Sequence, residues 1–444
     1  MPTGNLARAT ARAPWRALVV HKYGGTSLAD VDRVRHAAGR VAAVAAGQRV
    51  VVVVSAQGDT TDRLLAQGCA FDVPDGSREM DQLLATGETA SAALMALALR
   101  ERGLEAESLT GAQAGVRTHG RHGAGVVDRL APSRVHQLLG RRAVPVVTGY
   151  QGVDERGDTV TLGRGGSDTT AVALAAGLGA DRCEIYTDVP GVFSADPRIV
   201  PAPRLLPLVP VDVMAEMAFT GARVLHSRAV ELAQTHQVTT HVLGAATEGP
   251  GTVIPTDMPC PEQQEDLIRA LETAPVVTAV THDPDVSRVL VHCAGSGRDP
   301  APEVLSLLAE YGLPVDLVAR SGPYEDEFRM GFATRRSELA RVRRPLERLV
   351  RELGGEVRFQ GEVGKVTVVG TGLLNRPEVT ARMLTALAAS GTPTTWIHTS
   401  QVRTSALVPQ DRLTDAVRVL HTAFGLDLTE ETDPAAEPAP EIAR

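Results

Sequence analysis

Between residues 17 and 243, short β-branched runs alternate with helical patterns, and this alternation constrains the fold more than any other feature of the chain. The expected elements are strands over 17–25, 49–57, 143–152 and 183–188, and helices over 30–46, 60–68, 80–103 and 167–178. Such alternation predicts an α/β fold with a mainly parallel sheet, covered by helices on both faces. Ligands bind such sheets at the carboxyl ends of the strands.

A second pattern follows a Pro-, Gly- and acid-rich stretch at 244–275. A strand over 287–295 and a helix over 301–312 have the same layout as a strand over 365–372 and a helix over 377–391, and each pair is followed by further strands and a second helix. This is the β-α-β-β-α-β plan of ferredoxin-like domains, present twice. The expected domains are a disordered extension over 1–16, an α/β domain over 17–250, a linker over 251–275, ferredoxin-like domains over 276–364 and 365–428, and a disordered tail over 429–444.

Composition excludes several classes of protein. The net charge of −8 gives no global attraction to nucleic acid or to an anionic membrane, and 3% aromatic residues are too few for base-stacking platforms. The four cysteines form no CxxC pair, which argues against a disulfide framework or a structural zinc site. No apolar run reaches the roughly 18 residues of a membrane span. We therefore expect a cytoplasmic protein that binds neither nucleic acid nor membranes.

Two glycine-rich segments at strand ends combine charge with accessible backbone amides. Lys22 ends the first strand just before the Gly24–Gly25 pair, whose amides can approach an anion closely. The segment TLGRGGSDTT holds Arg164 among glycines, where a guanidinium suits a carboxylate or a phosphate. Ser167 and Asp168 come next, and either can also serve as the cap of the following helix.

Other candidate side chains have ordinary structural explanations as well. Thr187 and Asp188 precede a Pro-Gly turn, and Glu88 lies within a helix among small residues that would let a ligand approach. Ser55 and Thr61 can donate to a carboxylate or cap helix 60–68. The histidines show no metal-ligand spacing, so we expect no metal site built from protein side chains alone.

Together, the segments HKYGGTS, SAQGDTTDRLL, TGE, TLGRGGSDTT, CEIYTDVPGVFSADPR to GARVLH, and the paired C-terminal repeat resemble the aspartate kinase (aspartokinase) family over about residues 17–427. The resemblance implies that residues 17–250 form a catalytic domain with the amino-acid-kinase fold, followed by two intertwined ACT domains. It implies transfer of the ATP γ-phosphate to the β-carboxylate of L-aspartate, the first step toward lysine, threonine and methionine, with Mg²⁺ held mainly by the ATP phosphates. It also implies a homo-oligomer with a possible amino-acid effector.

The resemblance implies roles at matching positions. Lys22 and Asp168 are the expected catalytic residues, with Asp168 orienting the lysine. The expected aspartate-binding residues are Ser55, Thr61, Glu88, Arg164 and Ser167, with Arg164 on a carboxylate and Glu88 on the ammonium group. The expected nucleotide-binding residues are Lys22, Gly24, Gly25, Thr187, Asp188, Phe193, Arg198 and Arg223. Arg223 stands where the family usually has lysine.

The regulatory half departs from the family pattern. The family commonly binds lysine or threonine through a DKPG-like turn and a QN-like dipeptide, and the corresponding stretches here read SGRD (296–299) and RS (320–321). Altered polar groups leave partners of a cognate amino acid unpaired. We therefore expect feedback inhibition by lysine and threonine to be weakened, altered or absent.

Two other functions stay open from the residues themselves. One is a kinase of the same fold that acts on another small anion, such as glutamate, N-acetylglutamate, carbamate or a nucleoside monophosphate. The other is a non-catalytic amino-acid sensor. The paired repeat and the spacing of the glycine-rich motifs favour aspartate. The retained charges of Lys22, Arg164 and Asp168 argue against an inactive scaffold.

Overall fold

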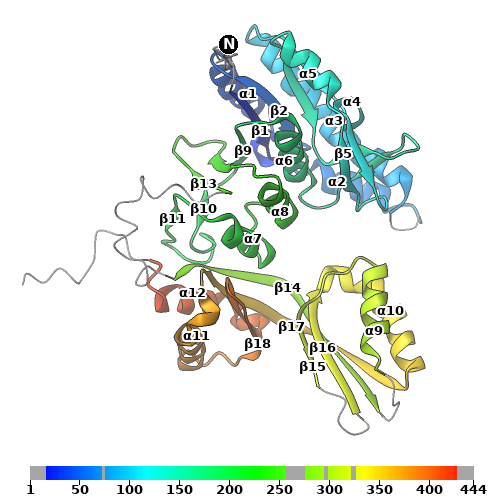
Figure 1. Ribbon diagram of the computed structural model, residues 1–444, viewed down its shortest axis with the longest axis vertical. Coiled ribbons are helices and arrows are strands. Elements are labelled where there is room, and N and C mark those ends of the chain that lie inside the picture. The colour runs from blue at the N-terminus through cyan, green and yellow to red at the C-terminus, as the bar shows by residue number, and fades with distance from the viewer. Residues whose placement is uncertain (1–16, 73–75, 257–275, 295–298, 322–326, 428–444) are drawn as a thin grey trace, which may run out of the picture. The chain divides into compact units, whose positions relative to one another are not determined.

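A computed structural model describes residues 17–72, 76–256, 276–294, 299–321 and 327–427 (Figure 1). The described chain divides into two compact units. The first contains residues 17–192, 206–218 and 223–256. Segments 193–205 and 219–222, which fall inside the expected catalytic domain, pack with the C-terminal half in the second unit. The expected extension, tail and most of the expected linker lie outside the described residues, and the remaining domain limits stay predictions.

The first unit is built on a seven-stranded sheet. Its strands, in spatial order, are β13 (Thr252–Ile254), β12 (Thr240–Gly244), β9 (Arg182–Thr187), β1 (Leu18–Tyr23), β2 (Arg49–Val54), β6 (Val144–Thr148) and β3 (Ala106–Leu109). Every neighbouring pair is parallel except β12 and β13. The predicted mainly parallel sheet is therefore confirmed. The linker was expected to begin at residue 251. This limit is corrected, because residues 252–254 form an edge strand of this sheet.

Helices cover both faces of this sheet (Figure 1). The helices between residues 31 and 235 are α1 (Val31–Ala45), α2 (Thr60–Gly68), α3 (Arg78–Glu101), α4 (Gly111–Ala114), α5 (Ser133–Gly140), α6 (Gly166–Leu178), α7 (Val211–Phe219) and α8 (Ser227–Thr235). Helices α1 and α3 pack on the face that carries Val50, Val52 and Val54. Helix α6 contacts β1, β2 and β9. The run of valines in β2 is buried throughout, as expected for a central parallel strand.

Helix α3 is long and apolar enough to cross a membrane by length and composition alone. However, 56% of its most apolar stretch is buried within the unit, and the core helices of many soluble proteins pass the same test. The helix begins at Arg78 because the side chain of Ser77 accepts a hydrogen bond from the amide of Met80 at 3.2 Å. We therefore interpret α3 as a core helix.

A smaller sheet of four short strands flanks the main one. Its order is β5 (Val126–Leu130), β4 (Val116–His119), β7 (Gln151–Val153) and β8 (Thr159–Thr161). The single strand predicted over 143–152 is divided into β6 and β7, because the chain turns at Tyr150, where φ is +68°. The remaining short elements are β10 (Val192–Phe193), β11 (Leu205–Leu206) and the 3₁₀ turn Thr26–Leu28.

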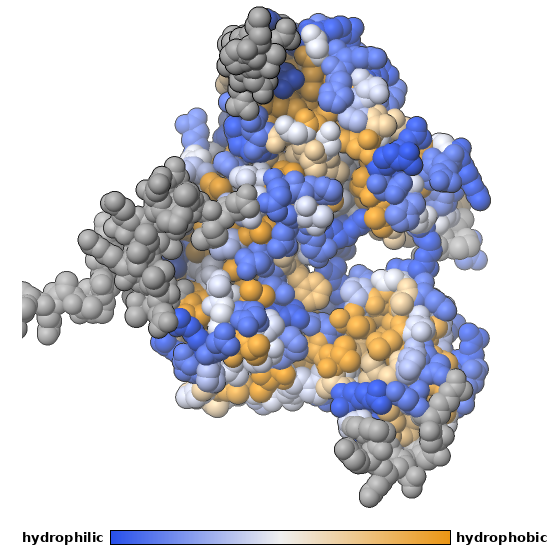
Figure 2. Space-filling view, in the orientation of Figure 1, coloured by the Kyte–Doolittle hydropathy of each residue, from blue (hydrophilic) through white to orange (hydrophobic). Residues whose placement is uncertain are grey.

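The second unit contains one antiparallel six-stranded sheet that both repeats share. Its order is β15 (Asp316–Arg320), β16 (Glu327–Arg335), β14 (Val277–Ala294), β17 (Gly355–Gly370), β19 (Arg403–Pro409) and β18 (Thr395–Thr399). Its helices are α9 (Ala301–Glu310), α10 (Arg336–Glu352), α11 (Pro377–Ala389) and α12 (Leu413–Ala423), and its 3₁₀ turns are Leu373–Asn375 and Gln410–Arg412. The two ferredoxin-like repeats are confirmed. Figure 2 shows apolar side chains reaching the surface over strands of this unit.

The two central strands of this sheet are longer than expected. Strand β14 begins at Val277 rather than at 287, and β17 begins at Gly355 rather than at 365. Pro284 and the two aspartates beside it interrupt the apolar pattern of β14. Register shifts between Asp283 and Arg288 absorb this interruption, so β14 and β17 remain paired from Val277 to Cys293.

Candidate active site

Lys22 and Asp168 form a buried ion pair at the carboxyl end of the main sheet. Lys22 lies near the end of β1, between β2 and β9, and its Nζ is 2.6 Å from Oδ1 of Asp168. Each side chain is 11% exposed. Asp168 is in the first turn of α6, where the helix dipole stabilises a negative charge. The structure thus brings together the two residues expected to be catalytic, and their roles stay predictions.

Two glycines after β1 place main-chain atoms beside this pair. The amide of Gly24 donates to the carbonyl of Tyr186 at 3.2 Å, and a Cβ on Gly24 would lie 3.7 Å from Nζ of Lys22. A Cβ on Gly25 would lie only 2.5 Å from the carbonyl oxygen of Ala56, so this position has no room for a side chain. The chain therefore passes close to the lysine amine, as an anion-binding strand end requires.

Glu88 is a carboxylate with one unsatisfied oxygen. It lies on α3 and is 2% exposed. Oε1 accepts a hydrogen bond from the amide of Ala56 at 3.1 Å, whereas Oε2 has no hydrogen-bond partner among the described residues. Burial raises the pKa of Glu88 to about 7, although the Ala56 amide works against this. A cationic group placed beside Oε2 would favour the ionised form.

Ser55 and Thr61 lie on the chain segment that Glu88 contacts. Ser55 follows β2 and immediately precedes Ala56, and Thr61 is in the first turn of α2. The approach of α3 to this segment depends on Gly87, because a Cβ there would lie 2.8 Å from the Cβ of Ala56. Ser55 and Thr61, on this segment, and Glu88, in contact with it, are therefore three expected substrate-binding residues that lie in one region of the first unit.

The segment 163–166 has the backbone that its glycines predict. Gly163 and Gly165 have φ of +73° and +71°, and Arg164 between them is exposed. Ser167 lies against the end of β6, because a Cβ on Gly149 would lie 2.6 Å from Oγ of Ser167. Arg164 is therefore presented on a loop just before α6, next to the strand ends.

Tyr150 relates this loop to Glu88. Burial raises the pKa of the Tyr150 phenol, the negative charges of Glu88 and Asp81 raise it further, and the positive charge of Arg164 lowers it. The phenol thus lies within electrostatic range of both Glu88 and Arg164. An amino acid bound between these two residues would meet a carboxylate at one end and a guanidinium at the other.

Only some of the expected nucleotide-binding residues lie on strand ends next to Lys22. Thr187 ends β9, the strand next to β1, and its hydroxyl donates to Asp188 at 3.0 Å. Arg223 is exposed between α7 and α8, and in the described part of the chain no contact joins it to Lys22 or Asp168. Phe193 and Arg198 belong to the second unit, where Arg198 pairs with Asp196 at 2.8 Å. Their roles stay predictions.

Asp81 and its partners were not among the residues predicted from the sequence. This carboxylate on α3 is 1% exposed and accepts hydrogen bonds from residues 122, 123 and 161. Asp81 stands seven residues before Glu88, a spacing that places both acids on one face of the helix. That spacing is the signal that could have found it.

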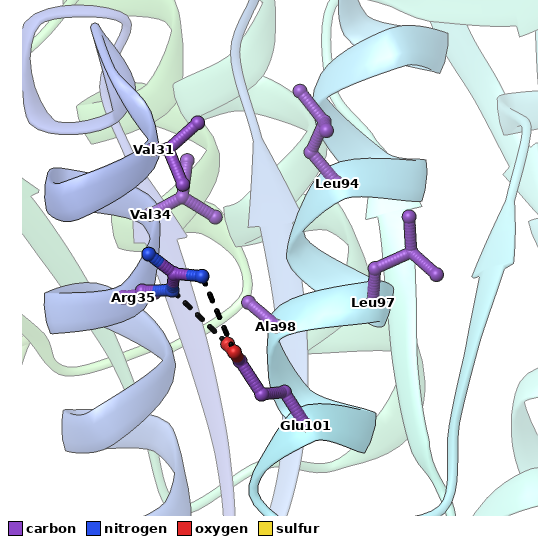
Figure 3. A pocket seen from close by; sticks show the side chains of 7 residues that line it. All are labelled: Val31, Val34, Arg35, Leu94, Leu97, Ala98 and Glu101. Atoms are coloured by element: carbon purple, nitrogen blue, oxygen red, sulfur yellow. Dashed lines mark hydrogen bonds and ion pairs between the residues drawn. The ribbon is translucent and has the colours of Figure 1, made fainter.

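A groove between α1 and α3 is not part of this site (Figure 3). Its volume is about 300 Å³, and its lining is mostly aliphatic, with Val31 and Leu97 well exposed. Its two charged residues, Arg35 and Glu101, neutralise each other through two hydrogen bonds of 3.1 and 3.2 Å. Such a lining lacks the fixed positive charge that a phosphate or a carboxylate would need.

Comparisons with known proteins agree on one family. The amino acid kinase family matches residues 17–244, and the ACT domain family matches residues 366–424. The chain is 39% identical to the aspartokinase of Thermus thermophilus over 414 residues, which is 93% of this chain and 99% of the relative. It is 42% identical to the aspartokinase of Mycolicibacterium smegmatis over 420 residues, 94% and 98% of the two chains. A solved structure of E. coli aspartokinase III with aspartate and ADP superposes with a TM-score of 0.76, at 26% identity, covering 91% of this chain and 99% of that one.

Proposed function

Because the chain belongs to the aspartokinase family, we propose that its first unit transfers the γ-phosphate of ATP to the β-carboxylate of L-aspartate. The observation that carries this proposal is the contact between Lys22 and Asp168 at the carboxyl end of β1. A lysine amine held there, beside glycine amides and a helix N-terminus, is suited to a polyphosphate.

The residues at this strand end fit a nucleotide. Lys22 would hold the transferring phosphoryl group, and the amide of Gly25 would approach the phosphate oxygens. The amide of Gly24 already donates to the carbonyl of Tyr186, so Gly24 would contribute the room left by its missing side chain. Thr187 and Asp188, on the neighbouring strand end, would contact the nucleotide. Mg²⁺ would arrive on the phosphates, as is usual for this ion in phosphoryl transfer. ATP supplies the reactive phosphoryl group, and the protein supplies position and charge.

The acceptor would lie between Arg164 and Glu88. Arg164 can form two parallel hydrogen bonds with a carboxylate, and Oε2 of Glu88 can accept one from an ammonium group. Binding of the substrate ammonium group would lower the raised pKa of Glu88. The carboxyl group would then be ionised and paired with the ammonium group. Ser55, Thr61 and Ser167 would donate to the remaining acceptor oxygens.

Catalysis by this site needs no general base. The β-carboxylate of aspartate is already an anionic nucleophile at neutral pH. The difficulty lies in bringing it to a polyanion, so the protein contributes by positioning the reactants and neutralising charge. Asp168 keeps the Lys22 amine in place during the transfer.

The test is ADP release from Mg-ATP with different acceptors, together with trapping of any acyl phosphate by hydroxylamine. We expect release and trapping that depend on aspartate. Turnover that is faster with glutamate or N-acetylglutamate than with aspartate would identify that acid as the substrate instead of aspartate. No turnover with any acceptor, together with lysine or threonine binding in calorimetry, would favour the sensor.

The second unit would serve as an ACT effector module with an altered response. Arg320, in the RS dipeptide, pairs with Asp299 at 2.9 Å, and its guanidinium lies 5.4 Å from the ring of Phe328. This side chain is thus already engaged within its own repeat. Residues 296–298 of the SGRD stretch lie outside the described residues. We also expect a cytoplasmic homo-oligomer, in keeping with the ACT repeats.

A further inference from the structure

Asp81 is a second buried carboxylate on the face of α3 that carries Glu88, and the mechanism above does not use it. Its Oδ1 accepts hydrogen bonds from the hydroxyl of Thr161 at 2.6 Å and the amide of Gly123 at 3.0 Å. Its Oδ2 accepts from the amide of Thr161 at 3.0 Å and from Nδ1 of His122 at 2.8 Å. Because a carboxylate only accepts, Nδ1 of His122 carries the proton.

The donors to Asp81 come from two segments that touch each other. Residues 120–125 connect β4 to β5, and Thr161 ends β8, just before the loop with Arg164. The amide of Gly125 donates to the carbonyl of Thr161 at 2.9 Å. A Cβ on Gly163 would lie 2.9 Å from the carbonyl oxygen of Gly123. The two segments are therefore packed backbone to backbone, and Asp81 joins both to α3.

Arg228 on α8 holds the same two segments through their carbonyl groups. Its Nη1 donates to the carbonyl of Leu162 at 2.7 Å, and its Nη2 donates to the carbonyl of Gly125 at 3.0 Å. Asp81 thus accepts hydrogen bonds from both segments, and Arg228 donates hydrogen bonds to backbone carbonyl groups of both. Helices α3 and α8 together fix the backbone that leads into Arg164.

We propose that Asp81, with His122, is a positioning residue for the amino-acid acceptor. It holds the Arg164 loop at a set distance from Glu88, because Asp81 and Glu88 lie on one helix, two turns apart. This inference rests on the proposed function of Arg164 and Glu88. The nucleotide side does not depend on Asp81 in this way, because Lys22 belongs to β1, which is fixed by β2 and β9, and the two glycines follow that strand directly. Asp168 lies on α6, which packs on β1, β2 and β9. Loss of the contact therefore weakens acceptor binding selectively.

The experiment compares Asp81→Asn, His122→Ala and His122→Asn in the full chain. KM is measured for aspartate at saturating ATP, and for ATP at saturating aspartate. Asp81→Asn replaces a carboxylate oxygen by an amide N–H group that faces existing donors. We therefore expect KM for aspartate to rise about tenfold or more, as for a lost charge-assisted hydrogen bond. KM for ATP stays within about twofold.

The His122 variants separate positioning from mere stability. His122→Ala removes the donor and should raise KM for aspartate about three- to tenfold. His122→Asn restores KM to within about twofold of the unmodified enzyme, because the Asn Nδ2 can occupy the place of the imidazole Nδ1. Glu79→Gln is the matched control: it removes an exposed acid from the first turn of the same helix and should leave both constants unchanged.

Three results would overturn the proposal. They are an equal rise of KM for ATP and aspartate, a lower melting temperature with both KM values unchanged, and a His122→Asn variant as impaired as His122→Ala. Hydrogen exchange gives a readout that does not require activity. Exchange should accelerate at 120–125 and 161–166 but not at 18–25, and uniform acceleration would also contradict the proposal. If the unmodified enzyme releases no ADP with aspartate, the proposed function fails, and exchange still decides whether Asp81 holds the loop. If Asp81→Asn does not fold, the His122 variants decide.

Discussion

The two units each bury a lysine against an aspartate, in surroundings that differ. Lys22 approaches Asp168 to 2.6 Å in the first unit, and Lys365 approaches Asp316 to 2.8 Å in the second. The lysine side chains are 11% and 5% exposed. The two pairs are similar in distance and in burial. Neither quantity can therefore distinguish a catalytic pair from a structural one.

The partners of Asp316 mark the second pair as structural. Asp316 also accepts a hydrogen bond from Arg403 at 2.8 Å, and both cations lie about 5 Å from the ring of Phe219. Burial by itself would raise the pKa of Asp316, but Lys365 and Arg403 hold it below its ordinary value. The cluster joins β15 of the first repeat to β17 and β19 of the second. The cluster therefore links the two repeats across their shared sheet.

The surroundings of Lys22 contain groups that can receive an anion. Beside it are Gly24, the main chain of Gly25, and the N-terminus of α6. No second cation competes for Asp168 in the described residues. A buried ion pair therefore indicates a site only where glycine backbone, a helix N-terminus and an approach for the ligand accompany it. The following variants test this distinction.

Lys22→Ala should produce the largest effect. Turnover should fall by roughly 10²–10⁴-fold, as on removal of other groups that stabilise developing charge, while binding of aspartate changes less. The measurement is the steady-state rate of ADP release. Lys365→Met is the matched control, because it removes a buried lysine of the second unit. Near-normal turnover in Lys22→Ala would refute the assigned role.

Asp316→Ala should instead destabilise the fold. Removing one member of a buried ion pair costs about 3–5 kcal/mol, because the remaining charges stay buried without compensation. Because the folded pKa of Asp316 is lowered, its stabilisation is present above the unfolded pKa and is lost as the pH falls through the folded value. Urea unfolding of the second unit should therefore show a difference at pH 7 that shrinks at pH 3. A difference that is independent of pH would contradict this account.

Glu88→Gln should show the opposite dependence on pH. The pKa of Glu88 is raised from 4.5 to about 7, so its contribution is most favourable below pH 4.5 and is lost as the pH rises through 7. A pKa raised from 4.5 to about 7 corresponds to ~3 kcal/mol. The variant should gain about this much relative to the unmodified protein between pH 5 and pH 8. Thermal unfolding at both values is the measurement, and a gain that is the same at both would be inconsistent with a raised pKa.

Lysine and threonine should have the smallest effect. At low millimolar concentration, alone or together, they should change turnover by less than about twofold, because the polar groups of the effector loop are altered. The variant Arg320→Gln/Ser321→Asn restores the dipeptide typical of the family and should increase sensitivity. Strong concerted inhibition of the unmodified enzyme would disprove the expectation.

Local patterns predicted most of the elements. The expected helix over 30–46 corresponds to α1, which begins at Val31 because Asp30 caps it through the amide of Arg33 at 2.8 Å. The expected helix over 377–391 corresponds to α11. The four-stranded sheet was not predicted, because β7 and β8 have three residues each, too few to show a period. Most of the residues of the candidate site were proposed from the sequence because glycines and charges at strand ends are visible in short segments, and their roles stay predictions.

The sequence by itself determined where strands and helices form and which strand ends carry glycine and charge, because these depend on neighbouring residues. Only the tertiary structure decided which charges meet. Lys22 and Asp168 are 146 residues apart, and Asp81 and Thr161 are 80 apart. An acid on a helix is normally solvated, and the spacing that places Asp81 on the helix face of Glu88 does not by itself show which partners Asp81 meets. Burial and the arrival of distant donors make Asp81 a structural anchor and leave Glu79 on the surface, since both depend on packing rather than on the period of the chain.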